Sequence, residues 1–466
     1  MTAPSITVEY VDPASLLVDL NVRSEAQLDK DFLASIRDLG VLVPIVAVRT
    51  TDGSLRVRFG KRRTLASVEV GQPLVPAVIV GEEDADQVAR IVSQWHENEY
   101  RSGLGTKDKL AAVEQLSLLG LSAAQIVKQT KARKQDVEQA LAASRSDLAK
   151  GAAERYEFLT LDAASAVAEF ESNTSTVKAL VAAAKQSDGD FRHALQRARD
   201  DRDEAAQQTA LIEQHTAAGT QVIDRPDYAD KTTRRLTSLL DSTGKRLSEQ
   251  THAACPGHAV YIEHNWQGIE AIPVCTDWPT HGHHDPDAAS ARLVGPMDDK
   301  AKAERKLVIT NNKEWKSASV VRRDWITTFV SRKTAPRGAA VYVAAELARG
   351  SHELRRAMER SPELAATLLG ADASHSRQSV TALTDTATDA RAQVIALGVV
   401  LGAVEASTST DTWRNPTEAV KRYFAFLSAN GYVLAEVEQI AAGTYKKAKR
   451  RTARAEASAD AEQAAA

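Results

Sequence analysis

The sequence predicts an α+β protein of several domains, most of them helical. The chain has 466 residues, which is room for about three domains of ~150 residues each. Charged residues make up 26% of the chain and aromatic residues 5%, a balance typical of helices with polar faces. Residues 1–105 contain both the apolar–polar alternation typical of strands and the apolar spacing typical of helices. Helical spacing dominates most of the remaining chain.

The net charge of −3 excludes a globally basic, histone-like binder of nucleic acid. Local basic patches are compatible with this net charge, and it is such patches that bind the phosphates of nucleic acid. Because no run approaches ~20 consecutive apolar residues, we expect no membrane-spanning helix and no membrane partner. The start of the chain lacks a signal-peptide pattern, and two cysteines cannot form a disulfide framework. These features predict a cytoplasmic protein with reduced thiols.

Turn signals divide the first segment into short strands and helices. Asp52-Gly53 is typical of a hairpin, and Gly40 follows helically spaced apolar residues as a helix-ending residue. The sequence therefore predicts a small α/β domain with at least three strands. We expect strands at 6–10, 44–48, 55–59 and 76–80, and helices around 32–39, 61–71 and 88–95.

A helical pattern begins at Thr106. Ser122 and Gln125 form a capping box that opens a short helix, and Thr130-Lys131-Ala132 is typical of a turn before a second helix. Two short helices on a tight turn indicate a helix-turn-helix. Plain structural hairpins share this pattern, and the usual turn glycine is absent.

Two short segments have the chemistry of an anion site. In Gly60-Lys61-Arg62-Arg63 a glycine ends a strand and three cations open a helix, which favours phosphate; a solvated basic turn is the alternative. In Glu97-Asn98-Glu99-Tyr100-Arg101 a carboxylate, an amide and an arginine suit a hydrated magnesium ion and a phosphate. No P-loop, Gly-x-Gly-x-x-Gly motif after a strand or hydrolase nucleophile elbow occurs in the sequence.

In order along the chain, these segments resemble the N-terminal half of the ParB family of partition proteins. The family pattern runs Asn-Pro-Arg, Gly-Val-x-x-Pro-Ile, Gly-Glu-Arg-Arg-x-x-Ala, Glu-Asn-x-x-Arg and then a helix-turn-helix. The corresponding segments here, within about residues 5–145, are Asn21-Val22-Arg23, Gly40-Val41-Leu42-Val43-Pro44-Ile45, Gly60-Lys61-Arg62-Arg63-Thr64-Leu65-Ala66, Glu97-Asn98-Glu99-Tyr100-Arg101 and the helix pair after them.

The resemblance implies a ParB- and sulfiredoxin-like α/β domain that binds CTP and magnesium; the catalytic cysteine of sulfiredoxin is missing. The implied nucleotide-site residues, from the base to the phosphates and metal, are Gly40, Pro44, Gly60, Arg62, Arg63, Glu97, Asn98 and Arg101. Lys61 stands where the family has an acidic residue, so we expect binding with slow hydrolysis or none, at most a weak CTPase. Val22 replaces the usual proline, a minor change.

The second helix of the pair would enter the major groove of DNA. The candidate DNA-binding residues are Lys131, Arg133, Lys134, Gln135 and Gln139. Arginine and lysine pair with guanine edges and glutamine with adenine, and some of these side chains will contact only phosphate.

The function predicted from this resemblance is sequence-specific DNA binding for plasmid or chromosome partition, with a CTP-dependent clamp switch. The expected partners are an inverted-repeat site on double-stranded DNA, a second copy of the chain and a ParA-like ATPase, at the nucleoid or a plasmid. One alternative is a transcriptional repressor without nucleotide switching, which Lys61 favours. The other is a ParB-like nuclease, for which Glu97 lacks a second acidic ligand nearby.

A second group of residues suits a metal. Six of the eleven histidines and both cysteines lie between His252 and His284. Two thiols and several imidazoles in two clusters, separated by a hairpin-sized insert, predict a tetrahedral zinc site of structural type. A surface histidine cluster around free thiols is the alternative. The candidate ligands are Cys255, His258, Cys275 and one of His281, His283 and His284.

The C-terminal part is helical and has two further basic features. Trp315, Val320, Val321, Trp325 and Phe329 fit one buried helical face with Arg322, Arg323, Arg332, Lys333 and Arg337 around it. The run 446–454 contains six cations and no acid, which suits a solvated helix end or nonspecific DNA contact.

The predicted domain organisation follows from these segments. It comprises a ParB-like nucleotide-binding domain (1–105), a helix-turn-helix domain (106–200), a charged helical linker (201–250), a zinc module (251–290), a helical C-terminal domain (291–445) and a basic, then low-complexity tail (446–466).

Overall fold

The computed structural model describes residues 6–18, 28, 30–50, 52–82, 87–102, 104–227, 230–265, 268–286, 298–359 and 362–445. The Asn21-Val22-Arg23 motif and the basic run 446–454 lie outside these residues. The chain divides into two units, Met1–Ser187 and Asp188–Ala466, each described by itself.

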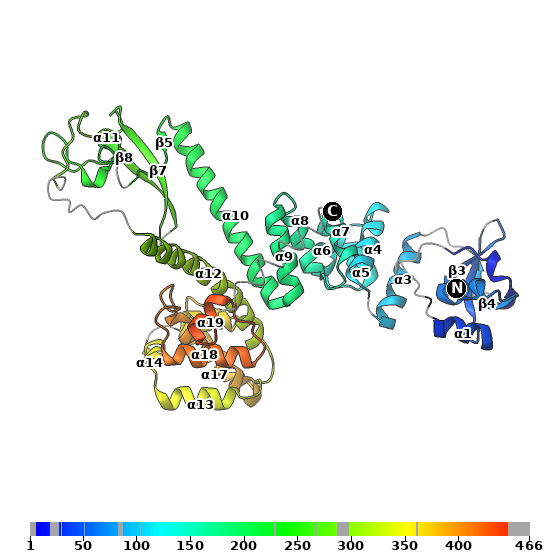
Figure 1. Ribbon diagram of the computed structural model, residues 1–466. Coiled ribbons are helices and arrows are strands. Elements are labelled where there is room, and N and C mark those ends of the chain that lie inside the picture. Colours follow the sequence, from blue (N-terminus) through cyan, green and yellow to red (C-terminus); the bar gives the residue numbers. More distant parts are fainter. Residues whose placement is uncertain are drawn as a thin grey trace. The chain divides into compact units, whose positions relative to one another are not determined.

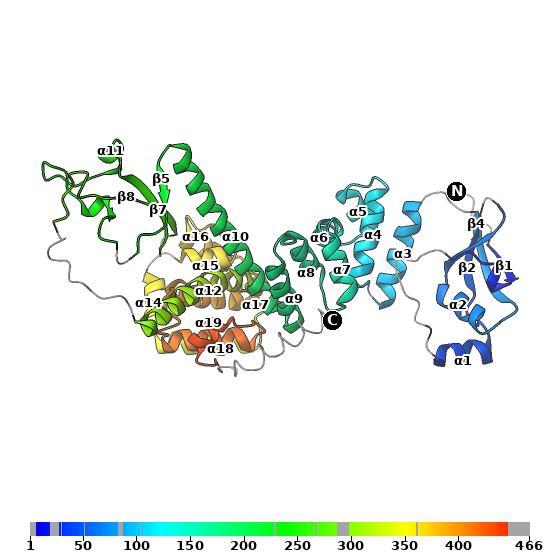
Figure 2. The same cartoon turned by 45° about the horizontal axis from the view of Figure 1, so that its top comes forward.

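The first unit begins with a four-stranded sheet of order β1-β4-β2-β3 (Figures 1 and 2). Its strands are β1 (Ile6–Val11), β2 (Ile45–Arg49), β3 (Leu55–Phe59) and β4 (Val75–Glu82). β2 and β3 form the predicted antiparallel hairpin, whose turn contains Gly53 at a φ of 89°. β1 pairs antiparallel with β4, whereas β2 and β4 run parallel. The expected α/β domain is therefore confirmed, with one strand more than the minimum expected.

Two helices complete this domain. α1 (Lys30–Leu39) ends at Gly40, which adopts a φ of 69°, as expected of a helix-ending residue. α2 (Lys61–Glu69) lies between β3 and β4 in sequence and provides the crossover that parallel strands require. The buried core joins α1, β2 and α2 through Ile36, Ile45 and Ala66.

The rest of the first unit is a series of helices. Each of α7, α8 and α9 begins at a polar residue whose side chain accepts a hydrogen bond from the first turn. The helices are α3 (Gln87–Ser102), α4 (Thr106–Leu118), α5 (Ala123–Thr130), α6 (Lys134–Ser144), α7 (Asp147–Arg155), α8 (Leu161–Glu169) and α9 (Thr174–Gln186).

The second unit begins with the long helix α10 (Asp188–Ala217), followed by a second four-stranded sheet of order β5-β7-β8-β6 (Figure 1). The hairpin of β7 (His258–His264) and β8 (Ile269–Cys275) is its centre, and the short strands β5 (Gln221–Ile223) and β6 (Arg234–Arg235) lie at its edges. The 3-10 helix η2 (Leu236–Ser238) and the short helix α11 (Glu249–His252) lie between β6 and β7.

This sheet corrects the predicted linker at 201–250. The helix α10 ends at Ala217, and the segment from Gln221 onward belongs to the sheet. Leu236, Leu239 and Leu247 are buried and pack with Cys275, so these leucines serve a small globular core. Their spacing along the chain does not distinguish such a core from a helical face.

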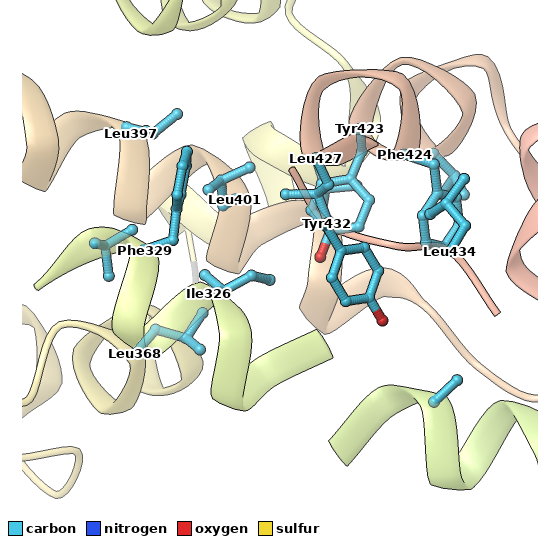
Figure 3. Close-up of a cluster of buried hydrophobic side chains, with 14 of the residues drawn as sticks. Ile326, Phe329, Leu368, Leu397, Leu401, Tyr423, Phe424, Leu427, Tyr432 and Leu434 are labelled. Atoms are coloured by element: carbon cyan, nitrogen blue, oxygen red, sulfur yellow. The ribbon is translucent and has the colours of Figure 1, made fainter. Parts of the chain in front are cut away.

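The C-terminal part of the second unit is helical, as predicted. Its helices are α12 (Asp299–Val330), α13 (Ala339–Arg349), α14 (His352–Glu359), α15 (Glu363–Leu368), α16 (Ser376–Asp385), α17 (Asp389–Ser407), α18 (Glu418–Ala429) and α19 (Glu436–Ala442). Side chains from α12, α15, α17 and α18 meet in one hydrophobic core (Figure 3). The labelled members of this core are Ile326, Phe329, Leu368, Leu397, Leu401, Tyr423, Phe424, Leu427, Tyr432 and Leu434.

Among the described residues, α17 is long and apolar enough to cross a membrane by length and composition alone. The sequence pattern predicted no such helix. More than half of α17 is buried inside the protein, and its buried Glu405 binds the guanidinium of Arg322. Two of its glycines also lie against neighbouring helices, since a Cβ on Gly402 would be 2.8 Å from Cα of Ala365. These contacts are those of a core helix.

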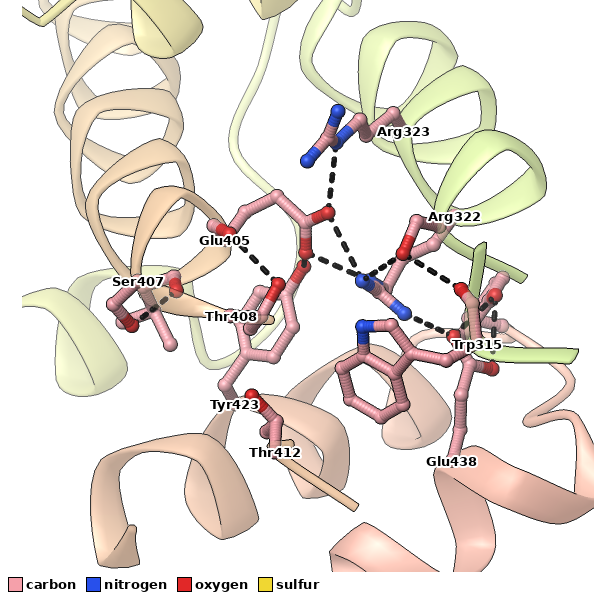
Figure 4. A network of polar contacts seen from close by, with 12 residues as sticks. Trp315, Arg322, Arg323, Glu405, Ser407, Thr408, Thr412, Tyr423 and Glu438 are labelled. Atoms are coloured by element: carbon pink, nitrogen blue, oxygen red, sulfur yellow. Dashed lines mark hydrogen bonds and ion pairs between the residues drawn. The ribbon is translucent and has the colours of Figure 1, made fainter. Parts of the chain in front are cut away.

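The predicted arrangement of α12 is only partly correct. Trp315 and Phe329 are buried as expected, but Val320 is 42% exposed. Arg322, expected on a basic surface, is completely buried. Its guanidinium donates to both oxygens of Glu405, over 2.7 and 3.0 Å, and to Glu438 (Figure 4). Two carboxylates that are distant in sequence compensate its charge, which the spacing within α12 does not reveal.

Candidate functional site

The predicted phosphate segment lies at the junction of β3 and α2. Gly60 caps α2 in the left-handed region, with a φ of 99°, and no side chain caps the first turn. The first turn of the helix therefore has the N–H groups and positive dipole end that favour an anion, and Lys61, Arg62 and Arg63 belong to that same turn.

The two arginines of this turn have different surroundings. The Arg63 guanidinium donates to the carbonyl oxygens of Val43 and, over 2.8 Å, Pro44. A Cβ on Gly60 would lie 3.3 Å from Nη2 of Arg63, so the glycine leaves room for that side chain. The Arg62 guanidinium lies over the Phe32 ring, 4.2 Å from its centroid. Arg63 thus joins the start of α2 to the Gly40–Pro44 segment. The two segments must lie together in this way if they belong to one nucleotide site.

The remaining nucleotide-site candidates lie on α3, which packs against α4 and α5. Asn98 is buried, and within the described part of the chain its Nδ2 has no hydrogen-bond partner. Glu97 is half-buried one position earlier. Arg101 belongs to the last turn of α3, and its side chain lies outside what the structure describes. The candidates therefore come from two places, Gly40 to Arg63 around β2 and α2, and Glu97 to Arg101 on α3.

The helix pair predicted from the capping box is present. Ser122 Oγ accepts from the backbone N–H of Gln125, and the Gln125 side chain accepts from the N–H of Ser122. Lys131 caps the C-terminal end of α5, and its φ of 54° is the left-handed conformation that a turn glycine usually adopts. Three residues separate the end of α5 at Thr130 from the start of α6 at Lys134, and the buried residues of α6 are Val137, Ala140, Ala143 and Ser144.

The five DNA-binding candidates differ in how their polar groups are engaged. Lys131 and Gln135 are exposed. Arg133, 84% exposed, pairs with Asp136 over 3.0 Å, and Lys134, 80% exposed, lies 3.6 Å from Glu138. Exposed pairs of this kind are worth ~0–1 kcal/mol and exchange easily for another anion. Gln139 is less exposed, and its amide donates to the carboxylate of Asp162 on α8.

The structure gathers four sulfur and nitrogen ligands at one end of the second sheet: His252, Cys255, Cys275 and His283, whose ligand atoms all lie within 4.8 Å of one another. Cys255, Cys275 and His283 were sequence candidates; His252 was not. The signal for His252 was the His252-x-x-Cys255 spacing, which mirrors Cys255-x-x-His258.

The other three candidate histidines lie around this group. His258 is outside the four, and its Nδ1 lies 3.0 Å from Nδ1 of His252. His281 lies beside Gly257, where a Cβ would be 2.6 Å from its Cδ2. His284 is exposed, and its backbone pairs with Leu240.

Burial shifts the titration of this group. It lowers the pKa of His252 to about 4, and the neighbouring imidazoles of His283, His258 and His281 act in the same direction. Burial also lowers the pKa of His283. Burial and the adjacent Cys255 raise the pKa of the Cys275 thiol to about 12. In the protein without metal, both imidazoles are therefore neutral at pH 7.

Comparison with known proteins gives one curated match. The chain is 30% identical over 117 residues to the probable chromosome-partitioning protein ParB of Treponema pallidum (strain Nichols), covering 24% of this chain and 35% of that protein. This chain contains a ParB-like domain. It spans about a third of the length of that relative, and no family model matches the chain.

Solved ParB structures are also similar to part of the chain. The Caulobacter crescentus ParB bound to the centromeric parS site has 17% identity and a TM-score of 0.28, covering 37% of this chain and 91% of that chain. The same protein complexed with CTP-gamma-S has 21% identity and a TM-score of 0.18, covering 39% and 98%. A pNOB8-like ParB N-domain has 17% identity and a TM-score of 0.27, covering 39% and 86%. The sequence match with ParB is the stronger comparison.

Proposed function

We propose that this chain is a ParB-like partition protein that binds a specific DNA site and is switched by CTP. The 30% identity over 117 residues with a chromosome-partitioning ParB is the observation that carries the proposal. The ordered motifs from Gly40 to Arg101 and the helix pair after them support it. As proposed, two copies of the chain bind an inverted repeat, and a ParA-like ATPase is the motor partner.

The proposed DNA contact is the N-terminal end of α6 with the turn before it. In a helix-turn-helix the first residues of the second helix meet base edges. Lys134 and Gln135 occupy that place and are exposed, and Lys131 and Arg133 flank it. Gln139 has a different role, because its amide is held by Asp162 on α8 and fixes how α6 packs.

The proposed nucleotide contact is the start of α2 with the Gly40–Pro44 segment. The Gly60–Arg63 turn binds the triphosphate. The hydrogen bond that the Arg63 guanidinium donates to the Pro44 carbonyl holds the Gly40–Pro44 segment, which contacts the base. Glu97 and Asn98 on α3 complete the site with magnesium, and the Asn98 amide has a donor to offer. Lys61 cannot replace the family carboxylate, so we expect binding with slow turnover.

A repressor without nucleotide switching is the second candidate, because Lys61 removes the acidic residue of the phosphate motif. Calorimetry of the full-length protein with each of the four nucleoside triphosphates and magnesium separates the two functions. CTP binding that Arg62→Ala and Arg63→Ala abolish, and that Arg37→Ala on the exposed face of α1 leaves intact, supports the switch. No binding of any triphosphate overturns the switch and leaves the repressor.

The DNA function is tested by selecting duplexes from a random library with full-length protein and measuring affinity by fluorescence anisotropy. Lys134→Ala should weaken binding by ~1–3 kcal/mol and relax specificity if Lys134 reads a base edge. If Lys134 meets only phosphate, the loss will be uniform across sequences and the salt slope will fall by about one. Lys178→Ala, an exposed lysine on α9, is the matched control. Unchanged affinity after substituting Lys131, Arg133, Lys134 and Gln135 together would overturn the assignment.

A further inference from the structure

We propose that His252, Cys255, Cys275 and His283 bind one zinc ion that closes the end of the second sheet, and that His258 positions His252 for this role. The inference is independent of the proposed DNA and nucleotide function. Its basis is the arrangement of the four ligand atoms, all within 4.8 Å of one another, and the way the chain brings them together.

Two of the distances between ligand atoms are close to the edges of a zinc tetrahedron, and all six are 4.8 Å or less. Zinc bonds of ~2.3 Å to sulfur and ~2.05 Å to nitrogen give edges of about 3.4 Å for N–N and about 3.6 Å for S–N. In the structure, Nε2 of His252 lies 3.1 Å from Nε2 of His283. Sγ of Cys255 lies 3.5 Å from the same Nε2 of His283. Three segments of the chain, the turn from His252 to Cys255, the end of β8 and the loop at His283, thus bring imidazoles and thiols as close together as a shared cation would.

Tight backbone turns place these ligands. The Cys255 N–H donates to the His252 carbonyl over 3.0 Å, and the His258 N–H donates to the Cys255 carbonyl over 2.9 Å. Cys275 is the last residue of β8 and pairs with His258 in the hairpin register. The His283 N–H donates to the Trp278 carbonyl over 3.2 Å, which folds the segment after β8 back onto the group.

Gly257 lies in the turn from Cys255 to His258 and shows how closely this turn approaches the end of β8. A Cβ there would lie 2.4 Å from the carbonyl oxygen of Thr276 and 2.9 Å from Sγ of Cys275. No side chain fits in this space, so a residue other than glycine would push Cys255 and Cys275 apart. The Thr276 N–H donates to the Gly257 carbonyl over 2.9 Å and fastens the turn to the strand.

His258 has the geometry of an outer partner. With Nε2 of His252 directed at the other ligands, its Nδ1 is free to donate to Nδ1 of His258, 3.0 Å away. A metal-bound histidine commonly donates its second ring N–H in this way, which fixes the ring orientation and the tautomer. The arrangement therefore makes His258 a positioning residue and His252 the ligand.

The donor set and its surroundings favour a structural zinc ion. Two thiolates and two imidazoles suit tetrahedral zinc, and four protein ligands leave no open coordination position. The core beside the group is small, since Leu236, Leu239, Leu247 and Cys275 are its buried members among the described residues. A module with so small a core gains stability from a metal.

The direct test is elemental analysis of full-length protein purified without a histidine tag or chelator from zinc-supplemented medium. We expect about one zinc ion per chain. A zinc content near zero would overturn the proposal, and so would a disulfide between Cys255 and Cys275, detected as the absence of titratable thiols in unfolded, chelator-treated protein. Replacement of zinc by cobalt(II) in the wild-type protein should give the intense visible bands of tetrahedral thiolate coordination; weak octahedral bands would contradict the site.

Single substitutions test the ligand set. His252→Ala should lose zinc, whereas His281→Ala and His284→Ala, the matched histidine controls, should keep one zinc ion per chain. His258→Ala should keep the cobalt spectrum but release zinc to a chelator ~10–100-fold faster. His258→Gln, which retains a hydrogen-bonding group, should release it more slowly than His258→Ala. Loss of zinc from His258→Ala with retention by His252→Ala would overturn the roles assigned to the two histidines.

Discussion

Replacing Arg322 with methionine tests the buried ion cluster of the C-terminal helices. Methionine keeps much of the length of the side chain and removes its charge. Arg322, Glu405 and Glu438 have completely buried side chains, so no solvent screens the carboxylates once the guanidinium is gone. Burial lowers the pKa of Arg322, but the two carboxylates outweigh it and raise this pKa well above its ordinary value. The arginine is therefore charged at every pH at which the protein folds.

The expected loss follows from the contacts that remain. Removing one partner of a buried ion pair costs ~3–5 kcal/mol because it leaves an uncompensated charge. Glu405 keeps the Tyr423 hydroxyl and Nε of Arg323, each 2.9 Å away. Glu438 keeps a hydroxyl and a backbone N–H. Because neither carboxylate is left without partners, we expect Arg322→Met to lower the free energy of unfolding by ~3 kcal/mol, the low end of that range.

Urea unfolding of the full-length protein, with hydrogen exchange to locate the change in the C-terminal helices, measures this loss. Arg323→Met is the matched control, because its guanidinium also binds Glu405 but is 46% exposed. That pair should be worth ~0–1 kcal/mol. Adding Glu405→Gln and Glu438→Gln to Arg322→Met should recover part of the loss, since no buried charge then remains. Equal losses for Arg322→Met and Arg323→Met would refute the reasoning.

Three other changes test local features of the structure. Gly402→Ala should destabilise the second unit by ~1–2 kcal/mol in urea unfolding, because its Cβ would press on the backbone of Ala365. Gly398→Ala, whose three nearest contacts would be with the Leu369 side chain and not with backbone, should cost less than Gly402→Ala, and equal effects would contradict this. Lys131→Gly should raise the melting temperature of the first unit and increase its free energy of unfolding by ~0.5–1 kcal/mol, because a residue with a Cβ is strained in the left-handed conformation. A lower melting temperature would contradict this expectation. Burial raises the pKa of Asp230, but hydrogen bonds from two threonines outweigh it and hold this pKa well below 3.8. Its stabilisation is therefore present above pH ~4 and lost as the pH falls further, so Asp230→Asn should flatten the acid limb of stability against pH; an unchanged limb would exclude this role.

The N-terminal sheet was predictable because its signals are local. Alternation marks the strand at 6–10, short apolar runs mark those at 44–48 and 76–80, and Asp52-Gly53 and Gly40 occupy positions where a turn and a helix end require them. The capping box at Ser122 was equally local, since both of its partners lie within four consecutive residues. The helix pair kept its turn without a glycine because Lys131 adopts the left-handed conformation itself.

Two features that the sequence pattern predicts wrongly, the exposure of Arg322 and the linker after Gln221, both depend on partners that are distant in sequence. Arg322 resembles its neighbour Arg323 in any window of α12, and only Glu405 and Glu438 make one of them a core residue. The sequence pattern predicts a linker for the segment after Gln221 because strands of two and three residues have no periodicity to detect. Its leucines pack against Cys275, at the end of the second strand of the β7–β8 hairpin.

The candidate sites show why residue type and spacing cannot rank the members of a site. Lys134 and Gln139 both suit a base edge by chemistry, and they lie five positions apart on one helix. The lysine is 80% exposed beside a carboxylate it can leave easily, whereas the glutamine amide is committed to Asp162 on another helix. For Gln139 to reach DNA it would have to abandon a charge-assisted hydrogen bond, which is worth more than a neutral one. A recognition surface therefore consists of the candidates whose polar groups are exposed or held only by solvent-exposed ion pairs, and folding decides which those are.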